Sequence, residues 1–183
     1  MDDETITRLA LAARAGDRDA AASFVRATTG QVRRVLGYLS EKHVTDDLVQ
    51  ETYLRAFTAL PRYAERSPAR LWLLSIARRV AADQVRAAQR SPRTSSLDVE
   101  HAATRYAAPS SAGWVELQRA IAALDLERRE AFVLTRVLGL SYEEAAEVCR
   151  CPVGTIRSRV FRARGELLDV LGGASGAASS SGP

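Results

Sequence analysis

The feature that most restricts the fold is a segment without helical periodicity that is flanked on both sides by segments with it. Apolar residues recur at helical spacing over 5–60, 70–90 and 114–171, and no strand-like alternation persists. Between the last two segments, residues 91–113 lose the period and are rich in Ser, Ala, Pro and Thr, the composition of a flexible tether. We therefore predict an all-α protein with two small helical domains joined by a flexible linker.

Turn-forming residues divide the first block. The period breaks at AGDRD, around Gly30 and at SEKHVTDD, and we predict three helices in this part of the chain. A loop with two prolines follows, and a long helix is expected over 70–90. The first domain is predicted to span residues 1–92.

The second block is expected to be a compact set of short helices joined by tight turns. These helices are predicted over 114–123, 127–138, 141–149 and 153–171. The chain ends in GGASGAASSSGP, a low-complexity sequence expected to be disordered. The remaining boundaries are therefore a linker over 93–113, a second domain over 114–171 and a tail over 172–183.

Composition restricts where the chain can act. Its net charge of +4 is only modestly basic, so the position of the charge matters more than the total. The first residues, MDDETITRLA, are acidic, and no apolar run approaches the roughly 18 residues of a membrane span. The two cysteines, Cys149 and Cys151, fit neither a disulfide nor a standard zinc pattern. We expect a cytoplasmic protein without membrane insertion, metal or cofactor.

One helix near the C-terminus has an entirely basic polar side. In CPVGTIRSRVFRARGEL the apolar positions fall within about 80° of one another, which predicts a buried stripe of Val153, Ile156, Val160, Ala163 and Leu167. The opposite side carries Thr155, Arg157, Ser158, Phe161 and Arg162, with no acidic residue before Glu166.

The residues before this helix complete a DNA-binding pattern. Ser141 and Glu144 form a predicted capping box at the start of a short helix, and a tight turn at 149–152 separates that helix from the basic one. This is the helix-turn-helix pattern, whose second helix enters the major groove. A solvated surface helix is the alternative, although such helices usually mix charges of both signs.

The segment LSYEEAAEVCRCPVGTIRSRVFRARGEL resembles region 4 of the extracytoplasmic-function (ECF) sigma factors of the sigma-70 family. In that family the helix docks on the promoter minus-35 element. The resemblance implies base and sugar-phosphate contacts by Arg157, Ser158, Phe161 and Arg162, and phosphate contacts by Thr155, Arg159 and Arg164.

Two stretches of the first block carry a second resemblance. DDLVQETYLRAF is similar to sigma region 2.2, which binds the clamp helices of RNA polymerase. The resemblance implies core-enzyme binding by Asp47, Leu48, Gln50, Glu51 and Arg55. From the spacing alone, a capped helix that only faces solvent is an equal alternative.

The second stretch, YAERSPARLWLLSIARRVAADQVRAAQR, has a basic ridge on its helix, formed by Arg79, Arg86 and Arg90, with Asp83 beside it. An ordinary surface of mixed charge is the alternative. The stretch resembles sigma regions 2.3 and 2.4, which capture the minus-10 element as the strands separate. This implies a pocket for a flipped nucleotide in the preceding loop, and DNA contacts by Tyr63, Arg66, Arg70, Arg79 and Arg86.

The combined prediction is an alternative sigma factor without catalytic residues. Its implied partners are promoter DNA and core RNA polymerase, through the clamp helices of the largest subunit and the flap of the second-largest. The resemblance also allows an anti-sigma factor as a partner.

Three alternatives remain open from the residues. The first is an enzyme acting on DNA, with metal-binding carboxylates among Asp46, Asp47, Glu51 and Asp83. The second is an autonomous helix-turn-helix regulator that dimerises or binds a ligand and reads a two-fold symmetric site. The third concerns the cysteine pair, which could act as a redox switch or could simply pack as small apolar residues.

Overall fold

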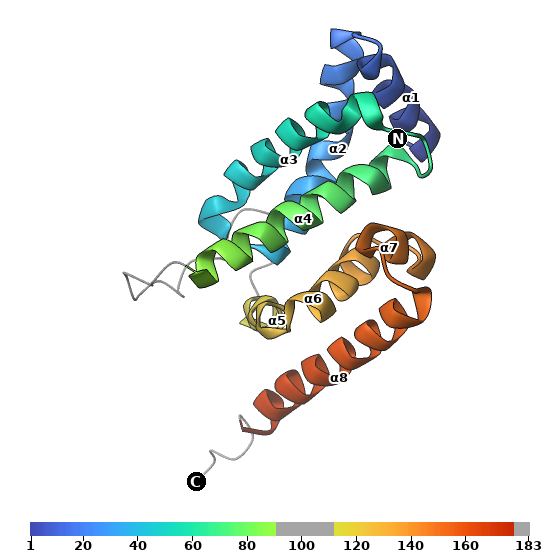
Figure 1. Ribbon diagram of the computed structural model, residues 1–183. Helices are drawn as coiled ribbons and strands as arrows, with labels where there is room; N and C mark the ends of the chain where they lie inside the picture. Colours follow the sequence, from blue (N-terminus) through green and yellow to red (C-terminus); the bar gives the residue numbers. More distant parts are fainter. Residues whose placement is uncertain (91–111, 178–183) are drawn as a thin grey trace.

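The architecture consists of α-helices and short connecting turns. The computed structural model describes residues 1–90 and 112–177, and these contain eight α-helices and no strand (Figure 1). The predicted all-α fold is confirmed. Most of the predicted linker and the end of the predicted tail lie outside the described residues.

Four helices form the first block. Their bounds are α1 (Asp3–Arg14), α2 (Arg18–Leu39), α3 (Thr45–Ala59) and α4 (Ala69–Arg90). Short 3-10 turns precede and follow α3 (Lys42–Val44 and Leu60–Arg62). The starts of α1 and α2 are capped by carboxylates, because Asp2 accepts from Thr5 N at 2.8 Å and Asp17 accepts from Ala20 N at 2.9 Å. The long helix predicted over 70–90 is present as α4.

The predicted break at Gly30 does not occur. α2 runs through this glycine without interruption from Arg18 to Leu39. Phe24 lies before Gly30 and Val32 after it, and both are fully buried on the same apolar face. Burial of that face outweighs the cost of about 1 kcal/mol for a glycine inside a helix.

The second block contains α5 (Ala112–Ala123), α6 (Leu126–Phe132), α7 (Tyr142–Cys149) and α8 (Val153–Ala177). The helix predicted over 127–138 is an α-helical segment followed by a π-helical turn, Val133–Val137. α8 passes its expected end at 171, so residues 172–177 of the predicted tail are helical. No proline interrupts this segment, and extending a helix requires no new nucleus.

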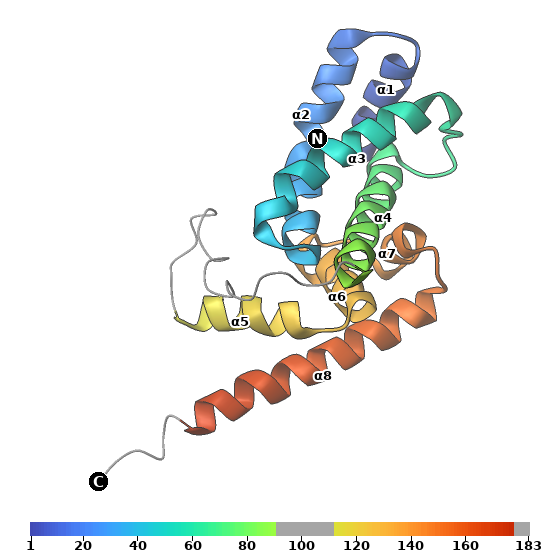
Figure 2. The same ribbon diagram turned by 60° about the vertical axis from the view of Figure 1, so that its left-hand side comes forward.

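The first block is organised around α2, which packs against α1, α3 and α4 (Figures 1 and 2). Its centre is filled by large, fully buried side chains, which include Phe24, Leu36, Leu39, Leu73 and Leu74. The second block has its own small cluster between α5, α6 and α8. This cluster contains Ile121, Val133, Ala163 and Leu167, so the basic helix is anchored along one side.

A buried tyrosine joins α3 to α2. The hydroxyl of Tyr53 lies 2.7 Å from Thr28 Oγ1, 3.2 Å from Thr29 Oγ1 and 3.3 Å from the carbonyl oxygen of Val25. Burial raises the pKa of Tyr53, and the two threonine hydroxyls oppose this shift. The ring and its hydroxyl therefore fix the angle between the two helices.

Replacing Tyr53 with phenylalanine is expected to lower the free energy of unfolding by about 1 kcal/mol, because the hydrogen bond is lost while the ring remains packed. Urea denaturation measures this change. Tyr142→Phe is the matched control, because the Tyr142 hydroxyl accepts an exposed hydrogen bond from Arg136. Equal effects of the two substitutions would contradict a special role for Tyr53.

The two blocks pack against each other along α4. Figures 1 and 2 both place α6 and α7 beside this helix, and α4 and α7 are in contact. Two ion pairs cross the boundary: Arg78 Nε lies 2.7 Å from Glu130 Oε2, and Arg70 Nη2 lies 2.8 Å from Glu144 Oε1. A hydrophobic cluster that holds residues of both blocks accompanies them.

Glu130 is a buried acidic residue at the boundary between the two blocks. Its side chain is only 1% exposed, and its second oxygen, Oε1, has no hydrogen-bond partner among the described residues. Burial raises the pKa of Glu130, and the charge and hydrogen bond of Arg78 oppose that shift. Since a buried carboxylate is costly without a cation beside it, the contact between the blocks depends on Arg78.

Candidate nucleic-acid interface

α7 and α8 form the predicted helix-turn-helix. The capping box at the start of α7 is present, because Glu144 N donates to Ser141 Oγ at 3.1 Å and Ser141 N donates to Glu144 Oε2 at 2.7 Å. Arg150 ends α7 in the left-handed conformation with φ of 54°. This turn sets the direction in which α8 leaves.

The buried stripe of α8 is confirmed at four of its five positions. Ile156, Val160, Ala163 and Leu167 are all at most 5% exposed, whereas Val153 at the start of the helix is half-buried. The opposite side therefore faces outward. Because packing fixes the rotation of α8 about its axis, the exposed residues follow directly from the stripe.

The exposed side of α8 is basic and has one large apolar residue. Arg157, Ser158, Arg162 and Arg164 are exposed, and Phe161 is 80% exposed. The guanidinium carbon of Arg157 lies 5.9 Å from the Tyr142 ring centroid. No acidic residue lies on α8 before Glu166, which pairs with Arg128. Such a surface can bind phosphates and read base edges.

Two residues predicted to contact DNA are less accessible. Thr155 is half-buried. The Arg159 side chain is only 18% exposed, and its guanidinium pairs with Glu127 and lies 3.8 Å from Cys151 Sγ. Arg159 therefore holds α8 against α6 in this arrangement, and a phosphate would have to compete with Glu127.

Of the residues predicted to contact the minus-10 element, some are exposed and others already bind carboxylates of the protein. Arg66, Arg79 and Arg86 are exposed. Arg79 folds back on its own helix, where Nε donates to the Ser75 carbonyl oxygen at 3.1 Å. Partial burial and repulsion from Arg150 and Arg78 lower the pKa of Arg79.

Arg70 is occupied by carboxylates. It makes a bidentate pair with Asp3, at 2.5 Å and 2.9 Å, and also reaches Glu144. Arg86 pairs with Asp83 at 2.5 Å, so the acid beside the predicted ridge does offset its charge. The ridge is present on α4 but is partly neutralised.

Tyr63 lies in the core. It is 4% exposed, its hydroxyl donates to the Ser67 carbonyl oxygen at 2.5 Å, and its ring centroid is 5.0 Å from that of Trp72. A direct nucleotide contact by Tyr63 stays a prediction, because the residue is mostly buried yet is among those that line a hollow beside the start of α4. Trp72 is half-buried and is therefore the more accessible of the two aromatic rings.

On α3, the predicted polar side chains are accessible and the predicted leucine is not. Asp47 and Gln50 are exposed. Arg55 bridges Glu51 and Asp83, at 2.6 Å from each. Leu48 is only 8% exposed because it lies on the inward face of α3, so its expected contact with a partner is not supported by its position.

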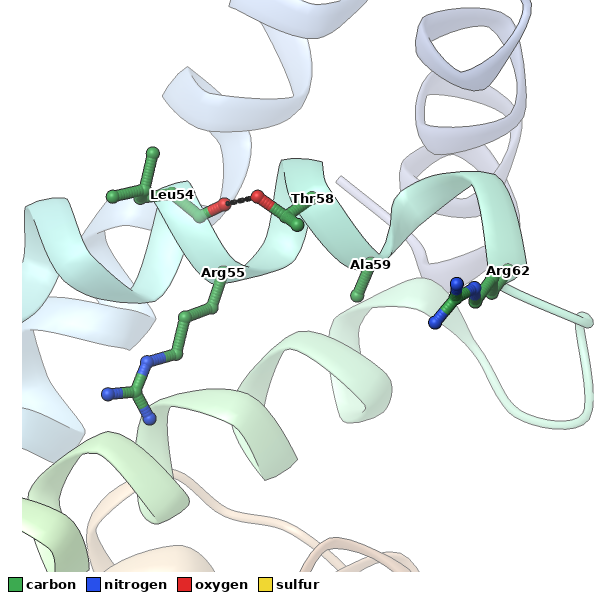
Figure 3. A pocket seen from close by; sticks show the side chains of 5 residues that line it. All are labelled: Leu54, Arg55, Thr58, Ala59 and Arg62. Atoms are coloured by element: carbon green, nitrogen blue, oxygen red, sulfur yellow. Dashed lines mark hydrogen bonds between the residues drawn. The ribbon is translucent and has the colours of Figure 1, made fainter.

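Sequence reasoning missed the apolar part of this surface. Leu54 is 66% exposed and Phe57 is 37% exposed on α3. Leu54 and Arg55 begin a hollow of about 380 Å³ that continues along Thr58 to Arg62 (Figure 3). Leu54 does not lie on the buried apolar stripe of α3. A leucine outside that stripe was the sequence signal that could have predicted an exposed apolar side chain. An exposed leucine next to an aromatic ring suits a protein partner.

Three of the four carboxylates proposed for a DNA-cleaving site are paired with arginines. Asp46 pairs with Arg33, while Glu51 and Asp83 share Arg55. Within residues 1–90 and 112–177, no three His, Cys, Asp or Glu side chains converge as a metal site would require. This arrangement does not favour the enzyme alternative.

The two cysteines have different environments. Cys149 is buried, and burial raises the pKa of its thiol to about 12. Cys151 is half-buried and receives the Arg159 contact. Because the thiolate is the reactive form, we expect a thiol reagent to modify Cys151 well before Cys149 in the native protein. Equal reaction rates, measured by mass spectrometry, would contradict this packing.

Comparison with known proteins identifies both blocks. The family described as Sigma-70 region 2 matches residues 24–91, and Sigma-70, region 4, matches residues 114–167. The ECF RNA polymerase sigma factor SigC of Mycobacterium tuberculosis is 50% identical over 91% of each chain. EcfG of Rhodopseudomonas palustris, also an ECF sigma factor, is 39% identical over 69% of this chain and 70% of its own.

Solved structures agree with these matches. The sigma factor RpoE of Bartonella quintana, in complex with the anti-sigma factor NepR, superposes with a TM-score of 0.69 and 31% identity, over 82% of this chain and 95% of that one. CnrH, in complex with the cytosolic domain of CnrY, gives a TM-score of 0.71 and 27% identity, over 94% and 99%.

Two sigma-70 regions in this order define a transcription initiation factor. The chain belongs to the ECF sigma factors of the sigma-70 family. A sigma factor directs core RNA polymerase to promoters and is not itself an enzyme, so the predicted family and function are confirmed. Among the described helices, none has the length and apolar character needed to cross a membrane.

Proposed function

We propose that α8 reads the minus-35 element, that α4 and the loop before it bind the minus-10 element, and that α3 binds the clamp helices of the largest polymerase subunit. Residues 1–92 and 114–171 then act as the two functional domains in the cytoplasm, and the second domain also contacts the polymerase flap. The observation that carries this proposal is the exposed face of α8, which combines basic side chains with Phe161 at 80% exposure.

At minus-35, the exposed arginines of α8 provide paired donors for guanine or phosphate, and Phe161 can contact a thymine methyl group. Thr155, Ser158 and Arg164 then bind the flanking backbone, and Arg159 joins them once a phosphate displaces Glu127. Near minus-10, Arg66, Arg79 and Arg86 are the accessible donors, and Arg70 joins them once a phosphate displaces Asp3 and Glu144.

The core-binding face of α3 combines the polar residues predicted from sequence with the exposed apolar pair. Asp47, Gln50 and Glu51 supply hydrogen-bond acceptors and charge, while Leu54 and Phe57 supply apolar area. The related sigma factor RpoE of Bartonella quintana is bound to the anti-sigma factor NepR in its solved structure. An anti-sigma partner is therefore part of the proposal for this chain.

Leu54→Glu is expected to weaken association with core polymerase about tenfold, because a charge replaces the apolar centre of the contact. Ala22→Glu is the control, because it adds the same charge at an exposed position of α2. Competition binding against the unmodified chain measures both. Equal affinity of the two variants would place the core contact elsewhere.

The proposed function is tested by run-off transcription with purified core polymerase and a promoter library. We expect transcripts only when both proteins are present, from templates that share two elements at a fixed spacing. Transcription that depends on one symmetric element would favour the autonomous regulator instead.

A further inference from the structure

A hollow of about 470 Å³ lies where the loop before α4 meets the end of α7. The first block contributes Arg62, Arg66 and Trp72 to its lining, and the second block contributes Glu147 and Arg150. The volume falls within the range of roughly 300–1,000 Å³ that is usual for small-molecule sites. Because both blocks line it, the hollow is complete only while they are packed together.

Positive charge exceeds negative charge in this hollow. Three arginines, Arg62, Arg66 and Arg150, line it together with a single carboxylate, Glu147. None of the three arginines forms an ion pair with another of the described residues. Arg79 lies near enough to repel Arg150. Arginines that line one hollow and have no carboxylate partner are suited to a phosphate-bearing ligand.

The backbone beside the hollow is left-handed at two residues. Arg150 has φ of 54°, and Glu65, which is next to Arg66, has φ of 55°. Within the described part of the chain, the other residues with positive φ are Gly16 and Gly139. At Arg150 this conformation is the C-cap of α7, a position at which glycine is favoured over arginine. The structure thus keeps a charged side chain where glycine would fit better.

An aromatic ring lines the same space. Trp72 is half-buried and its ring centroid lies 5.0 Å from that of Tyr63, which is itself fixed by the hydrogen bond to Ser67. A half-buried tryptophan ring that packs against a buried tyrosine, tilted by 41° to it, can contact a planar base. Base-stacking surface and phosphate donors therefore occur together.

We propose that this hollow binds a free nucleoside polyphosphate between the two blocks. Arg62, Arg66 and Arg150 hold its phosphates, and Trp72 contacts its base. Since the site needs both blocks, the bound nucleotide favours their packed arrangement. It also opposes entry of the minus-10 strand at the loop before α4, and this competition alone rests on the proposed function.

Nucleotide binding can be measured on the full-length chain without polymerase or promoter. In a Trp114→Phe background, Trp72 is the single tryptophan, and its emission reports the hollow. We expect GTP or ATP to change this emission with saturation, and inorganic phosphate to bind at least about tenfold more weakly because it lacks a base. No saturable change up to about 10 mM nucleotide would overturn the proposal.

Arg150→Gly is the decisive variant, because it removes the guanidinium and suits the left-handed backbone. We expect nucleotide affinity to fall roughly tenfold or more while the melting temperature is unchanged or raised. Arg119→Ala, an exposed arginine on α5 outside the hollow, should retain full affinity.

Undiminished nucleotide binding by Arg150→Gly would overturn the two-block site. A single-stranded oligonucleotide that binds both chains equally would then assign the hollow to promoter DNA. Run-off transcription by the unmodified chain does not depend on this result, so the two proposals fail separately.

Discussion

Replacing Arg157 and Arg162 together with alanine is expected to lower promoter-directed run-off transcription about a hundredfold, because each well-placed arginine contact contributes about 1–3 kcal/mol. Both side chains are exposed on the face of α8 opposite the buried stripe. Stability should therefore change little, and the loss should appear as weaker promoter binding by the assembled polymerase.

Arg119→Ala provides the control for this loss, because Arg119 is an exposed arginine on α5 and not on α8. The double variant should still bind core polymerase, since α3 is untouched. Promoter binding that stays within about twofold of the unmodified chain would contradict the assignment of α8 to minus-35 recognition. The salt dependence of promoter binding separates phosphate contacts from base contacts. Each lost phosphate contact reduces the slope of log binding constant against log salt concentration by about one.

Arg78→Ala is expected to weaken packing between the two blocks by about 3–5 kcal/mol, because Glu130 would remain buried without its cation. Separation of the blocks returns Glu130 to water, so each block should stay folded while the molecule expands. Small-angle X-ray scattering measures the expansion, and circular dichroism verifies the helices. An unchanged radius at neutral pH would contradict the structural importance of this pair.

The pH dependence follows from the direction of the Glu130 shift. Burial raises the pKa of Glu130 above its ordinary value of 4.5 in the packed state. The contribution of Glu130 to packing between the blocks is therefore fully present at pH values below 4.5 and is lost as the pH rises through the raised pKa. The Arg78→Ala variant should compact again as the pH is lowered, because protonated Glu130 is neutral.

A double variant tests whether the buried charge pair limits packing between the two blocks. Arg78→Met with Glu130→Leu replaces the buried pair by apolar side chains of similar size, and such replacements are commonly neutral or stabilising. We expect this chain to be compact at every pH at which its helices persist. Continued expansion of the double variant would show that the charge pair is not what limits packing.

Much of the fold was predictable from local pattern. The stripe of α8 and the capping box at Ser141 depend on residues a few positions apart, so the sequence contains the whole signal. The break predicted at Gly30 was wrong because tertiary burial on both sides of α2 exceeded the helical cost of one glycine. The π-helical turn at Val133–Val137 had no local signal.

The site was less predictable because it depends on contacts between distant residues. Nothing near Arg70 in sequence indicates that Asp3 and Glu144 occupy it. Tyr63 was expected to meet a nucleotide, but packing against Trp72 placed it in the core. The exposed Leu54 was missed because helical spacing indicates which residues face inward and does not indicate which outward residues meet a partner.

The most direct test is a footprint on one promoter with the purified chain alone, core polymerase alone, and both together. We expect protection of the minus-10 and minus-35 elements, with strand opening at minus-10, only in the combined sample. Linking two weak contacts on one large enzyme supplies the affinity that neither block has by itself. Tight protection of a single symmetric site by the chain alone, or no protection with core polymerase present, would contradict this account.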